Sequence, residues 1–519
     1  MSGQGPTAAE LAWGATWPDL DGFRGLTKDR RVVPVVRRLL ADDVTPVGLY
    51  RRLAQGRPGT FILESAELDG RWPRYSFVGV SSIATLTVRD GEVAWQGEVP
   101  AGVPTEGNPL DVLGGALEVL RTPAIAGLPP LTSGLVGSVG WDFVYQWEPT
   151  LPAKAPEELE VPELTLCLAV DLAVVDHIEG AVWLVANAIN VDGADTGVDE
   201  AYASAVERLD AMQAALAEPV PAHAAVLDPD AVEPAFMARS TPEEYAQNVR
   251  IGKEAIRDGE VFQVVLSQRL DLDCPADPLD VYRVLRTINP SPYMYYVQLQ
   301  DADGHDFAVV GSSPETLVKV DDGHVTTFPI AGSRPRGATP EEDRALADEV
   351  LADPKERAEH IMLVDLSRND LAKVCEPTSV DVVEFMAVRR FSHIMHITST
   401  VVGRLRAGAT ALQTLTATFP AGTLSGAPKT RAIALIDEVE PARRGIYGGT
   451  VGYFDFAGNM DMAIAIRTAL IRDGRASVQA GGGIVADSVP ELEYQESRNK
   501  AQAAVRAIQV ASRLRRADG

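Results

Sequence analysis

Residues 479–501 read QAGGGIVADSVPELEYQESRNKA, a strand-like run that passes through three glycines into the last helix of the chain. The segment Ser488-Val489-Pro490-Glu491 has the form of a helix start, with proline in the first turn. Inside that helix Glu493 and Glu496 share a face, and Lys500 follows one turn later. The passage therefore predicts a strand, a glycine-rich connection and a long helix with a charged face.

Strands and helices are mixed along the rest of the chain. The helix starts that carry proline in the first turn stand at Thr241, Thr339 and Asp353. Because the strands are grouped with helices without a strict βα alternation, the sequence predicts an α+β fold. The strand-like runs are FILES (61–65), SIATLTV (82–88), LTLCLAVDLAVVDH (164–177), VFQVVLSQRL (261–270), YMYYVQL (293–299) and DMAIAIRTALI (461–471).

A segment rich in alanine and proline divides the chain. Residues 213–238 show little periodicity, which is typical of a linker. We therefore expect an N-terminal region over residues 1–212 and a second domain over residues 239–519.

Composition limits the partners and the location. The chain has 519 residues, of which 47 are basic and 73 acidic, so its net charge is −26. Such a surface repels nucleic acid and anionic membranes, and we expect neither as a partner. The three cysteines are widely spaced, the N-terminus lacks a secretory pattern, and no apolar run reaches the roughly 18 residues of a membrane helix. These features predict a cytoplasmic protein.

Two predicted helices each carry a pair of carboxylates on one face. Glu356 and Glu359 are three residues apart in the helix over 355–366, as Glu493 and Glu496 are in the last helix. Together they could hold a hard cation such as Mg²⁺, which proteins bind through one or two carboxylates. The same spacing is common on solvated helix surfaces, so the pattern by itself leaves both interpretations open.

Other segments offer groups that recognise anions. Gly481, Gly482 and Gly483 allow backbone N–H groups to approach an anion, although a flexible turn has the same composition. Arg467 interrupts an apolar strand, where it is either an edge residue or a carboxylate clamp. Gly332-Ser333 is a close-approach point or a turn, and His396 in an apolar strand is more often structural than catalytic.

Ten segments in order across residues 259–501 resemble the chorismate-utilising enzymes, and most closely the anthranilate synthase component I members. The resemblance implies an α+β fold with a large layered β-sandwich-like core flanked by helices, in which the N- and C-terminal halves interleave. The segments are GEVFQVVLSQR, NPSPYMYY, GSSPETLVKV, PIAGSRPRG, DPKERAEHIMLVDLSRNDLAKVC, FSHIMHITSTVVG, FPAGTLSGAPKTRA, RGIYGGTVGY, MDMAIAIRTALI and QAGGGIVADSVPELEYQESRNKA.

The resemblance also implies roles for individual residues. Glu359 and Glu496 would bind Mg²⁺, with Glu356 and Glu493 acting through water or by orienting the site. Glu315 would be the general acid that protonates the departing C4 hydroxyl of chorismate, and His396 would assist the loss of pyruvate. Thr423, which would hydrogen-bond a substrate hydroxyl, and Lys500, which would add positive charge, also count among the implied catalytic residues. The substrate-binding residues implied by the resemblance are Gly332, Ser333, Tyr447, Arg467, Gly481, Gly482 and Gly483.

Two positions select the nucleophile in this family. Relatives that add water have a lysine at the position of Gln263, and aminodeoxychorismate synthase has one at the position of Ala331. Neither residue is basic here, which favours attack by ammonia at C2 of chorismate and elimination of pyruvate to give anthranilate. No cysteine lies in the glycine-flanked setting of a glutaminase nucleophile, so we expect a separate glutamine amidotransferase subunit, in a heterotetramer of two large and two small subunits.

The resemblance further implies feedback inhibition by tryptophan. The residues expected at this regulatory site are Leu63, Glu64, Ser65, Asn289, Pro290, Pro292, Tyr293, Met294 and Tyr453. The alternatives are aminodeoxychorismate synthase component I, disfavoured by Ala331, and a non-catalytic tryptophan-binding module, which would not need the Glu315, Glu359, His396 and Glu496 side chains.

Overall fold

Antiparallel strands form the centre of the molecule. The structure is a computed structural model that describes residues 11–66, 74–151, 154–194, 196–218, 224–226, 236–390 and 394–516. The strands of the N-terminal half are β1 (Thr16–Trp17), β2 (Val32–Leu40), β3 (Thr60–Glu64), β4 (Tyr75–Arg89), β5 (Glu92–Gly97), β6 (Gly134–Val139), β7 (Leu164–Asp176) and β8 (Ala181–Ile189).

The strands of the C-terminal half continue the same hydrogen-bonded network. They are β11 (Gln263–Asp273), β12 (Tyr293–Gln300), β13 (Asp306–Ser313), β14 (Thr316–Asp321), β15 (His324–Thr327), β16 (Ile330–Pro335), β17 (Asp381–Arg390), β18 (Ile394–Arg404), β19 (Gly426–Ala427), β20 (Thr450–Asp455), β21 (Met460–Ile464), β22 (Thr468–Arg472) and β23 (Arg475–Ile484), with the short β9 (Ala225–Val226), β10 (Met237–Ala238) and β24 (Arg515–Arg516).

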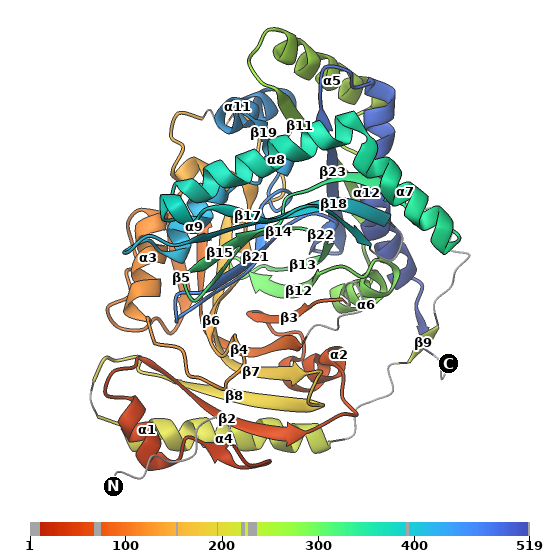
Figure 1. The fold of residues 1–519 in the computed structure, drawn as a ribbon. Helices are drawn as coiled ribbons and strands as arrows, with labels where there is room; N and C mark the ends of the chain where they lie inside the picture. Colours follow the sequence, from red (N-terminus) through yellow and green to blue (C-terminus); the bar gives the residue numbers. More distant parts are fainter. Residues whose placement is uncertain are drawn as a thin grey trace.

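Helices cover the outside of this sheet (Figure 1). Threonine caps α5 in a complete capping box and also caps α7, and Asp353 caps α8, as their sequences predict. The helices are α1 (Leu20–Leu26), α2 (Pro46–Leu49), α3 (Pro109–Val119), α4 (Val198–Ala217), α5 (Pro242–Arg257), α6 (Pro278–Ile288), α7 (Pro340–Ala352), α8 (Pro354–Ala372), α9 (Ala411–Thr418), α10 (Gly422–Ser425), α11 (Lys429–Val439) and α12 (Pro490–Ala511). None of the described helices combines the length and the apolar composition needed to cross a membrane.

The two halves of the chain share strands rather than meeting at a boundary. Strand β3 of the N-terminal half pairs with β12, and β6 pairs with β20, always antiparallel. Two arms therefore leave the central β4: one continues through β3, β12, β13, β22, β23 and β11, and the other through β7, β6, β20, β21 and β14. This confirms the α+β fold with a large antiparallel sheet.

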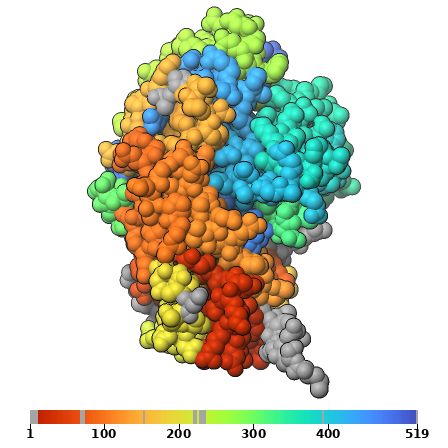
Figure 2. Space-filling view, turned by 90° about the vertical axis from the view of Figure 1, so that its left-hand side faces the viewer, coloured from red at the N-terminus to blue at the C-terminus, as the bar shows by residue number. Residues whose placement is uncertain are grey.

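An apolar core lies between the two arms. Phe61 and Val136 from the N-terminal half pack there with Tyr295, Val309 and other side chains of the C-terminal half. Each arm also has an outer core under helices, one including α6 and α12 and the other α3 and α11. Figure 2 shows the result on one face, where the orange surface of the N-terminal half adjoins the blue and cyan surface of the C-terminal half.

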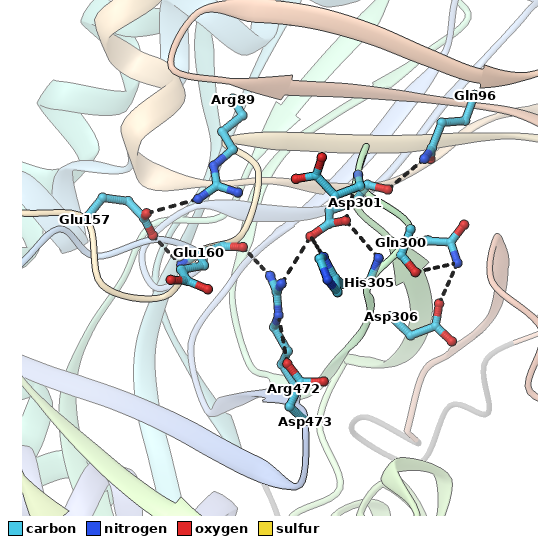
Figure 3. Close-up of polar contacts among 12 residues, drawn as sticks. Arg89, Gln96, Glu157, Glu160, Gln300, Asp301, His305, Asp306, Arg472 and Asp473 are labelled. Carbon is cyan, nitrogen blue, oxygen red and sulfur yellow. Dashed lines mark hydrogen bonds and ion pairs between the residues drawn. The ribbon is translucent and has the colours of Figure 1, made fainter.

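Polar contacts add to this interleaving at one edge of the sheet (Figure 3). The Arg472 guanidinium donates to the Glu160 carbonyl and pairs with Asp301 at 3.2 Å. The Gln96 amide donates to the Asp301 carbonyl at 2.8 Å. The loop at Glu160 is thus tied to β22, and β5 is tied to the loop that follows β12.

Three sequence-based boundaries differ from the structure. The predicted linker, 213–238, begins inside α4, which extends to Ala217, and its residues 219–223 and 227–235 lie outside the described ones. The run 461–471, predicted as one strand, is two strands, β21 and β22, separated at residues 465–467. The glycines at 481–483, predicted as a connection, lie within β23 and pair with β11.

Candidate active site

Carboxylates from α8 and α12 converge on the glycines of β23. The Gln263 amide at the start of β11 donates to Glu359 of α8 at 3.3 Å. The same amide nitrogen would lie 2.2 Å from a Cβ added at Gly483. At the adjacent Gly482, an added Cβ would lie 3.1 Å from an oxygen of Glu493 and 3.7 Å from one of Glu496. The two helices therefore present their carboxylates to neighbouring points on one strand.

This cluster carries more negative charge than its own cations neutralise. Burial raises the pKa of Glu359, and the nearby Glu356 raises it further. Burial likewise raises the pKa of Glu493, and Glu496 adds to the effect. Glu356 has a partner in Arg334 at 3.6 Å, whereas Glu359 and Glu493 form no ion pair within the part of the chain that the structure describes. The cluster suits a divalent cation bound through oxygen.

Lys500 lies at the centre of the candidate site. Its ammonium group pairs with Glu496 at 2.7 Å and donates to the Gly481 carbonyl at 3.1 Å. The same charge opposes the burial of Glu315, Glu359 and Glu493 by lowering the pKa of each carboxyl. Glu315 is therefore within the electrostatic reach of Lys500, as Glu359 and Glu493 are.

Gly481, Gly482 and Gly483 allow close approach of other groups to β23 rather than flexibility of a loop. A Cβ at Gly481 would lie 2.2 Å from the Leu266 carbonyl, so the strands approach too closely for a side chain there. Strand β22 pairs with β23 only as far as Val478, so beyond it the outer edge of β23 has no partner strand among the described residues. Backbone N–H groups on this edge are available to a ligand.

Arg467 sits at the break between β21 and β22 rather than within a strand. Its φ of 54° is in the left-handed region, which is uncommon for a side chain of this size. Burial lowers the pKa of its guanidinium, and no carboxylate pairs with it within the described ranges. A half-buried cation without a counter-ion is suited to bind an anionic ligand.

Sequence reasoning missed the pair that supports Tyr447. Arg444 is 2% exposed, pairs with Glu440 at 2.7 Å, and stacks on the rings of Trp141 and Tyr447 with centroid distances of 4.3 and 5.5 Å. Burial raises the pKa of the Tyr447 hydroxyl, so it remains protonated at neutral pH and can donate. The arginine before GIYGG was visible, but nothing in the sequence indicated that it was buried.

Glu315 has the properties of a general acid. It lies between β13 and β14, and its carboxylate accepts a hydrogen bond of 2.8 Å from Thr423 of α10. Burial raises the pKa of Glu315 to about 7, while Thr423 and Lys500 lower it by smaller amounts. A carboxyl with this pKa is partly protonated at neutral pH and can give up a proton.

His396 lies on β18 beside a bulge in β16. Its Nδ1 is 3.0 Å from the Gly332 carbonyl and 3.0 Å from the Ser333 hydroxyl. A carbonyl only accepts, so Nδ1 carries the proton and Nε2 the lone pair. Burial, with smaller contributions from Arg467 and Lys500, lowers the pKa of His396 to about 4, so the ring is neutral at pH 7. The positive φ of Gly332, 63°, forms the bulge that places its carbonyl there.

The two positions expected to select the nucleophile are both buried. Gln263 is 3% exposed, and its Oε1 has no hydrogen-bond partner among the described residues. Ala331 is 9% exposed and precedes the Gly332 bulge on β16. Gln263 is neutral and Ala331 is small, so neither position supplies an amine.

A separate cavity of roughly 230 Å³ lies between the two arms of the sheet. Its lining combines Leu63 and Ser65 of the N-terminal half with Pro292, Met294 and Tyr453 of the C-terminal half, and it also includes Glu64 and Tyr293. The cavity therefore brings together seven of the nine residues expected at the regulatory site.

The other expected regulatory residues lie differently. Asn289 and Pro290 are not among the lining residues; Asn289 ends α6, and its carbonyl accepts from Ser312. Glu64 lines the cavity, but its carboxylate accepts from Tyr282 at 2.5 Å and from Arg286 at 2.9 Å on α6. That carboxylate is already satisfied within the protein.

A second acidic group lies away from this site. Asp301, Asp303 and His305 place ligand atoms within 4.8 Å of one another, a spacing that would suit a metal ion. The Asp301 carboxylate, however, already pairs with Arg472 at 3.2 Å, as Figure 3 shows. A metal would have to compete with this guanidinium.

Comparison with known proteins identifies the family. The model of the chorismate binding enzyme family matches residues 45–506. Anthranilate synthase component 1 of Arthrobacter globiformis is 58% identical over 96% of this chain and 94% of its own, and that of Mycolicibacterium smegmatis is 56% identical over 95% and 94%. The crystal structure of anthranilate synthase component I from Streptococcus pneumoniae TIGR4 matches with a TM-score of 0.72 and 35% identity, covering 90% of this chain and 98% of its own. The chain belongs to the chorismate binding enzyme family and, within it, to anthranilate synthase component 1.

Proposed function

We propose that the chain converts chorismate and ammonia to anthranilate, pyruvate and water, as the first step of tryptophan biosynthesis. The observation that carries the proposal is Glu315, a buried carboxyl with a pKa of about 7, beside the acidic cluster of α8 and α12 and the neutral residues Gln263 and Ala331. This combination suits the protonation of a leaving hydroxyl in a site that has no lysine nucleophile at those positions.

Substrate binding must overcome the negative charge of the protein. Chorismate has two carboxylates, and Arg467 offers one of them a guanidinium that lacks a counter-ion within the described residues. Tyr447 can donate a hydrogen bond beside it, and the outer edge of β23 at Gly481–Gly483 offers backbone N–H groups. Lys500 adds positive charge nearby, and Ser333 supplies a hydroxyl.

The acidic cluster fits Mg²⁺. Burial raises the pKa values of Glu359 and Glu493, and a neighbouring carboxylate adds to each shift. A divalent cation relieves both effects. Glu359 and Glu496 would hold the ion, with Glu356 and Glu493 beside them. When bound, Mg²⁺ would neutralise the ring carboxylate of chorismate.

The first chemical step requires a proton at the C4 oxygen. Ammonia attacks C2 with its lone pair, the two conjugated ring double bonds each shift by one position, and the C4 hydroxyl leaves as water after taking the proton of Glu315. The ammonium group formed at C2 then loses one proton, so the charges balance. Thr423 holds the Glu315 carboxyl in place through its hydroxyl.

The second step removes the C2 proton and the enolpyruvyl group at C3. The electrons of the C2–H bond complete the aromatic ring as the C3–O bond breaks, and the released enolate is protonated to pyruvate. We assign this proton transfer to His396, whose ring is neutral and carries its own proton on Nδ1.

Ammonia must come from another chain. The described cysteines, Cys167, Cys274 and Cys375, are buried and lie outside this site, which does not suit a glutaminase nucleophile. The relatives are named component 1, which supports a second component. We propose a glutamine amidotransferase as that partner, in a cytoplasmic heterotetramer of two large and two small subunits.

Tryptophan would act at the cavity between the arms. Residues 1–212 and 239–519 both line it, so the N-terminal region would carry regulatory elements and the C-terminal domain the catalytic ones. Tryptophan, the end product of the pathway, would stabilise one arrangement of the two halves when bound there.

A product assay tests the proposal. The purified chain, with chorismate, Mg²⁺ and ammonium, should form fluorescent anthranilate and pyruvate in equal amounts, and glutamine should not replace ammonium. Glu315→Gln should bind chorismate normally and form no product. Formation of aminodeoxychorismate, or full activity of Glu315→Gln, would contradict the proposal.

A further inference from the structure

Two tyrosines of β12 line the regulatory cavity and also contact threonines that adjoin active-site residues. Tyr293 and Tyr295 are two residues apart, so their side chains extend from the same face of the strand. The Tyr293 hydroxyl accepts from Thr316 at 3.0 Å and donates to Asp461 at 2.9 Å. The Tyr295 hydroxyl lies 2.7 Å from that of Thr468.

Thr316 immediately follows Glu315. The backbone around this carboxyl is held by two further contacts: the Glu315 carbonyl accepts from the amide of Ile464 at 3.0 Å, and its amide donates to Ser313 at 3.3 Å. Thr316 is 9% exposed and has little room to move independently. A displacement of Tyr293 would therefore be passed to the Glu315 peptide.

Thr468 immediately follows Arg467. Its hydroxyl donates to the Ile466 carbonyl at 2.8 Å, so the hydrogen bond with Tyr295 must be donated by the tyrosine. The two contacts of Thr468 flank the left-handed backbone of Arg467, a conformation that persists only where the surroundings hold it. Loss of the Tyr295 contact would loosen the backbone that positions this guanidinium.

We propose that the Tyr293–Thr316 and Tyr295–Thr468 hydrogen bonds couple the cavity to the active site, with Thr316 positioning the general acid and Thr468 positioning the substrate-binding arginine. This inference rests on the proposed function, because it takes tryptophan as the ligand of the cavity. A ligand N–H group that binds Asp461, which also lines the cavity, competes with the Tyr293 hydroxyl for the same carboxylate. Occupation of the cavity then shifts both tyrosines and disturbs catalysis and substrate binding together.

Coupling between two ligands is measured as a ratio of dissociation constants. The full chain is titrated with L-tryptophan in the presence of Mg²⁺ and the absence of ammonium, once without chorismate and once with saturating chorismate. The ratio of the two Kd values for tryptophan measures the coupling, and such ratios are typically about 5- to 150-fold. In the double variant Tyr293→Phe/Tyr295→Phe the rings still line the cavity but the two hydroxyls are gone. We expect its ratio to fall below about 3.

The chain offers a matched control on the opposite face of the same strand. Tyr296 is 2% exposed, as Tyr295 is, but its hydroxyl donates to Gln298 and it does not line the cavity. Tyr296→Phe should keep the wild-type ratio. An undiminished ratio in the double variant, or an equal loss in Tyr296→Phe, would overturn the inference.

The two threonines should separate in steady-state kinetics. Thr316→Val should act mainly on kcat because it adjoins the general acid, and Thr468→Val mainly on the KM for chorismate because it adjoins Arg467. Identical effects of the two substitutions on both parameters would overturn their separate roles. A wild-type coupling ratio of one would overturn the regulatory part of the proposed function as well, whereas a high wild-type ratio that persists in the double variant overturns this inference alone.

Discussion

Thr423→Val should shift the pH profile of the enzyme in a defined direction. Burial gives Glu315 a pKa of about 7, so about nine-tenths of this carboxyl is protonated at pH 6 and about one-tenth at pH 8. Because the proposed role of Glu315 uses its protonated form, kcat/KM for chorismate should fall about tenfold per pH unit above pH 7. This slope is the reference against which the variant is compared.

The size of the shift follows from the hydrogen bond that is removed. Thr423 donates to a Glu315 oxygen at 2.8 Å, and a donor stabilises the ionised form and so lowers the pKa. A hydrogen bond to a charged group contributes about 1.5–3 kcal/mol, and one pKa unit corresponds to about 1.4 kcal/mol. Removal of the hydroxyl should move the alkaline limb up by about one pH unit, even if the maximal rate falls.

The assay is the initial rate of anthranilate formation between pH 6 and 9.5, with the concentration of free NH₃ held constant. Thr418→Val is the matched control, because its buried hydroxyl donates to the carbonyls of Thr414 and Leu415 instead of Glu315. The control should keep the wild-type limb. A wild-type profile that is flat to pH 9, or a limb that moves down in Thr423→Val, would refute the reasoning.

Three further predictions test the acidic cluster, the substrate-binding arginine and the regulatory cavity. Gly482→Ala places a methyl group 3.1 Å from a Glu493 oxygen, so half-maximal activity should need about tenfold more Mg²⁺. Gly25→Ala, whose methyl group would meet no atom within 4 Å, is the control and should not change the Mg²⁺ requirement. Arg467→Gln should raise the KM for chorismate about 10- to 100-fold with a smaller change in kcat, measured by initial rates; an unchanged KM would remove its role as a carboxylate ligand. Ser65→Phe and Met294→Thr, which alter the cavity lining, should each relieve tryptophan inhibition without loss of anthranilate formation, and unaltered inhibition curves in both would count against the regulatory assignment.

The sequence predicted those elements whose signals are local. Threonine caps and first-turn prolines located the starts of α5 and α7, because capping depends on a few adjacent residues. The run over 293–299 was correctly predicted as a strand. The pairing between β3 and β12, which joins the two halves, was not predicted, because no local pattern specifies a partner that lies more than 200 residues away. The family resemblance implied only that the two halves interleave.

The errors have a common physical cause. Glycines at 481–483 suggested a loop, since glycine is flexible, but in β23 they permit the Leu266 carbonyl, the Gln263 amide and the carboxylates of α12 to approach. The bend at Arg467 was hidden because apolar residues on both sides read as one strand. Likewise, buried Arg444 gave no signal, since its partner Glu440 is in an ordinary helical spacing. In each case the decisive contact is made by a residue distant in sequence or is revealed only by burial.

The charge balance of the site makes one further prediction. Glu356 and Glu496 form ion pairs with Arg334 and Lys500, whereas Glu359 and Glu493 form no ion pair within the described residues. A dianionic substrate would be repelled by these two carboxylates, and a divalent cation held by them would attract it. Chorismate should therefore tighten Mg²⁺ binding, and by linkage Mg²⁺ should tighten chorismate binding by the same factor. Calorimetric titrations of each ligand with and without the other, in the absence of ammonium, measure both factors. Independent binding would mean that the cation and the substrate do not share this site.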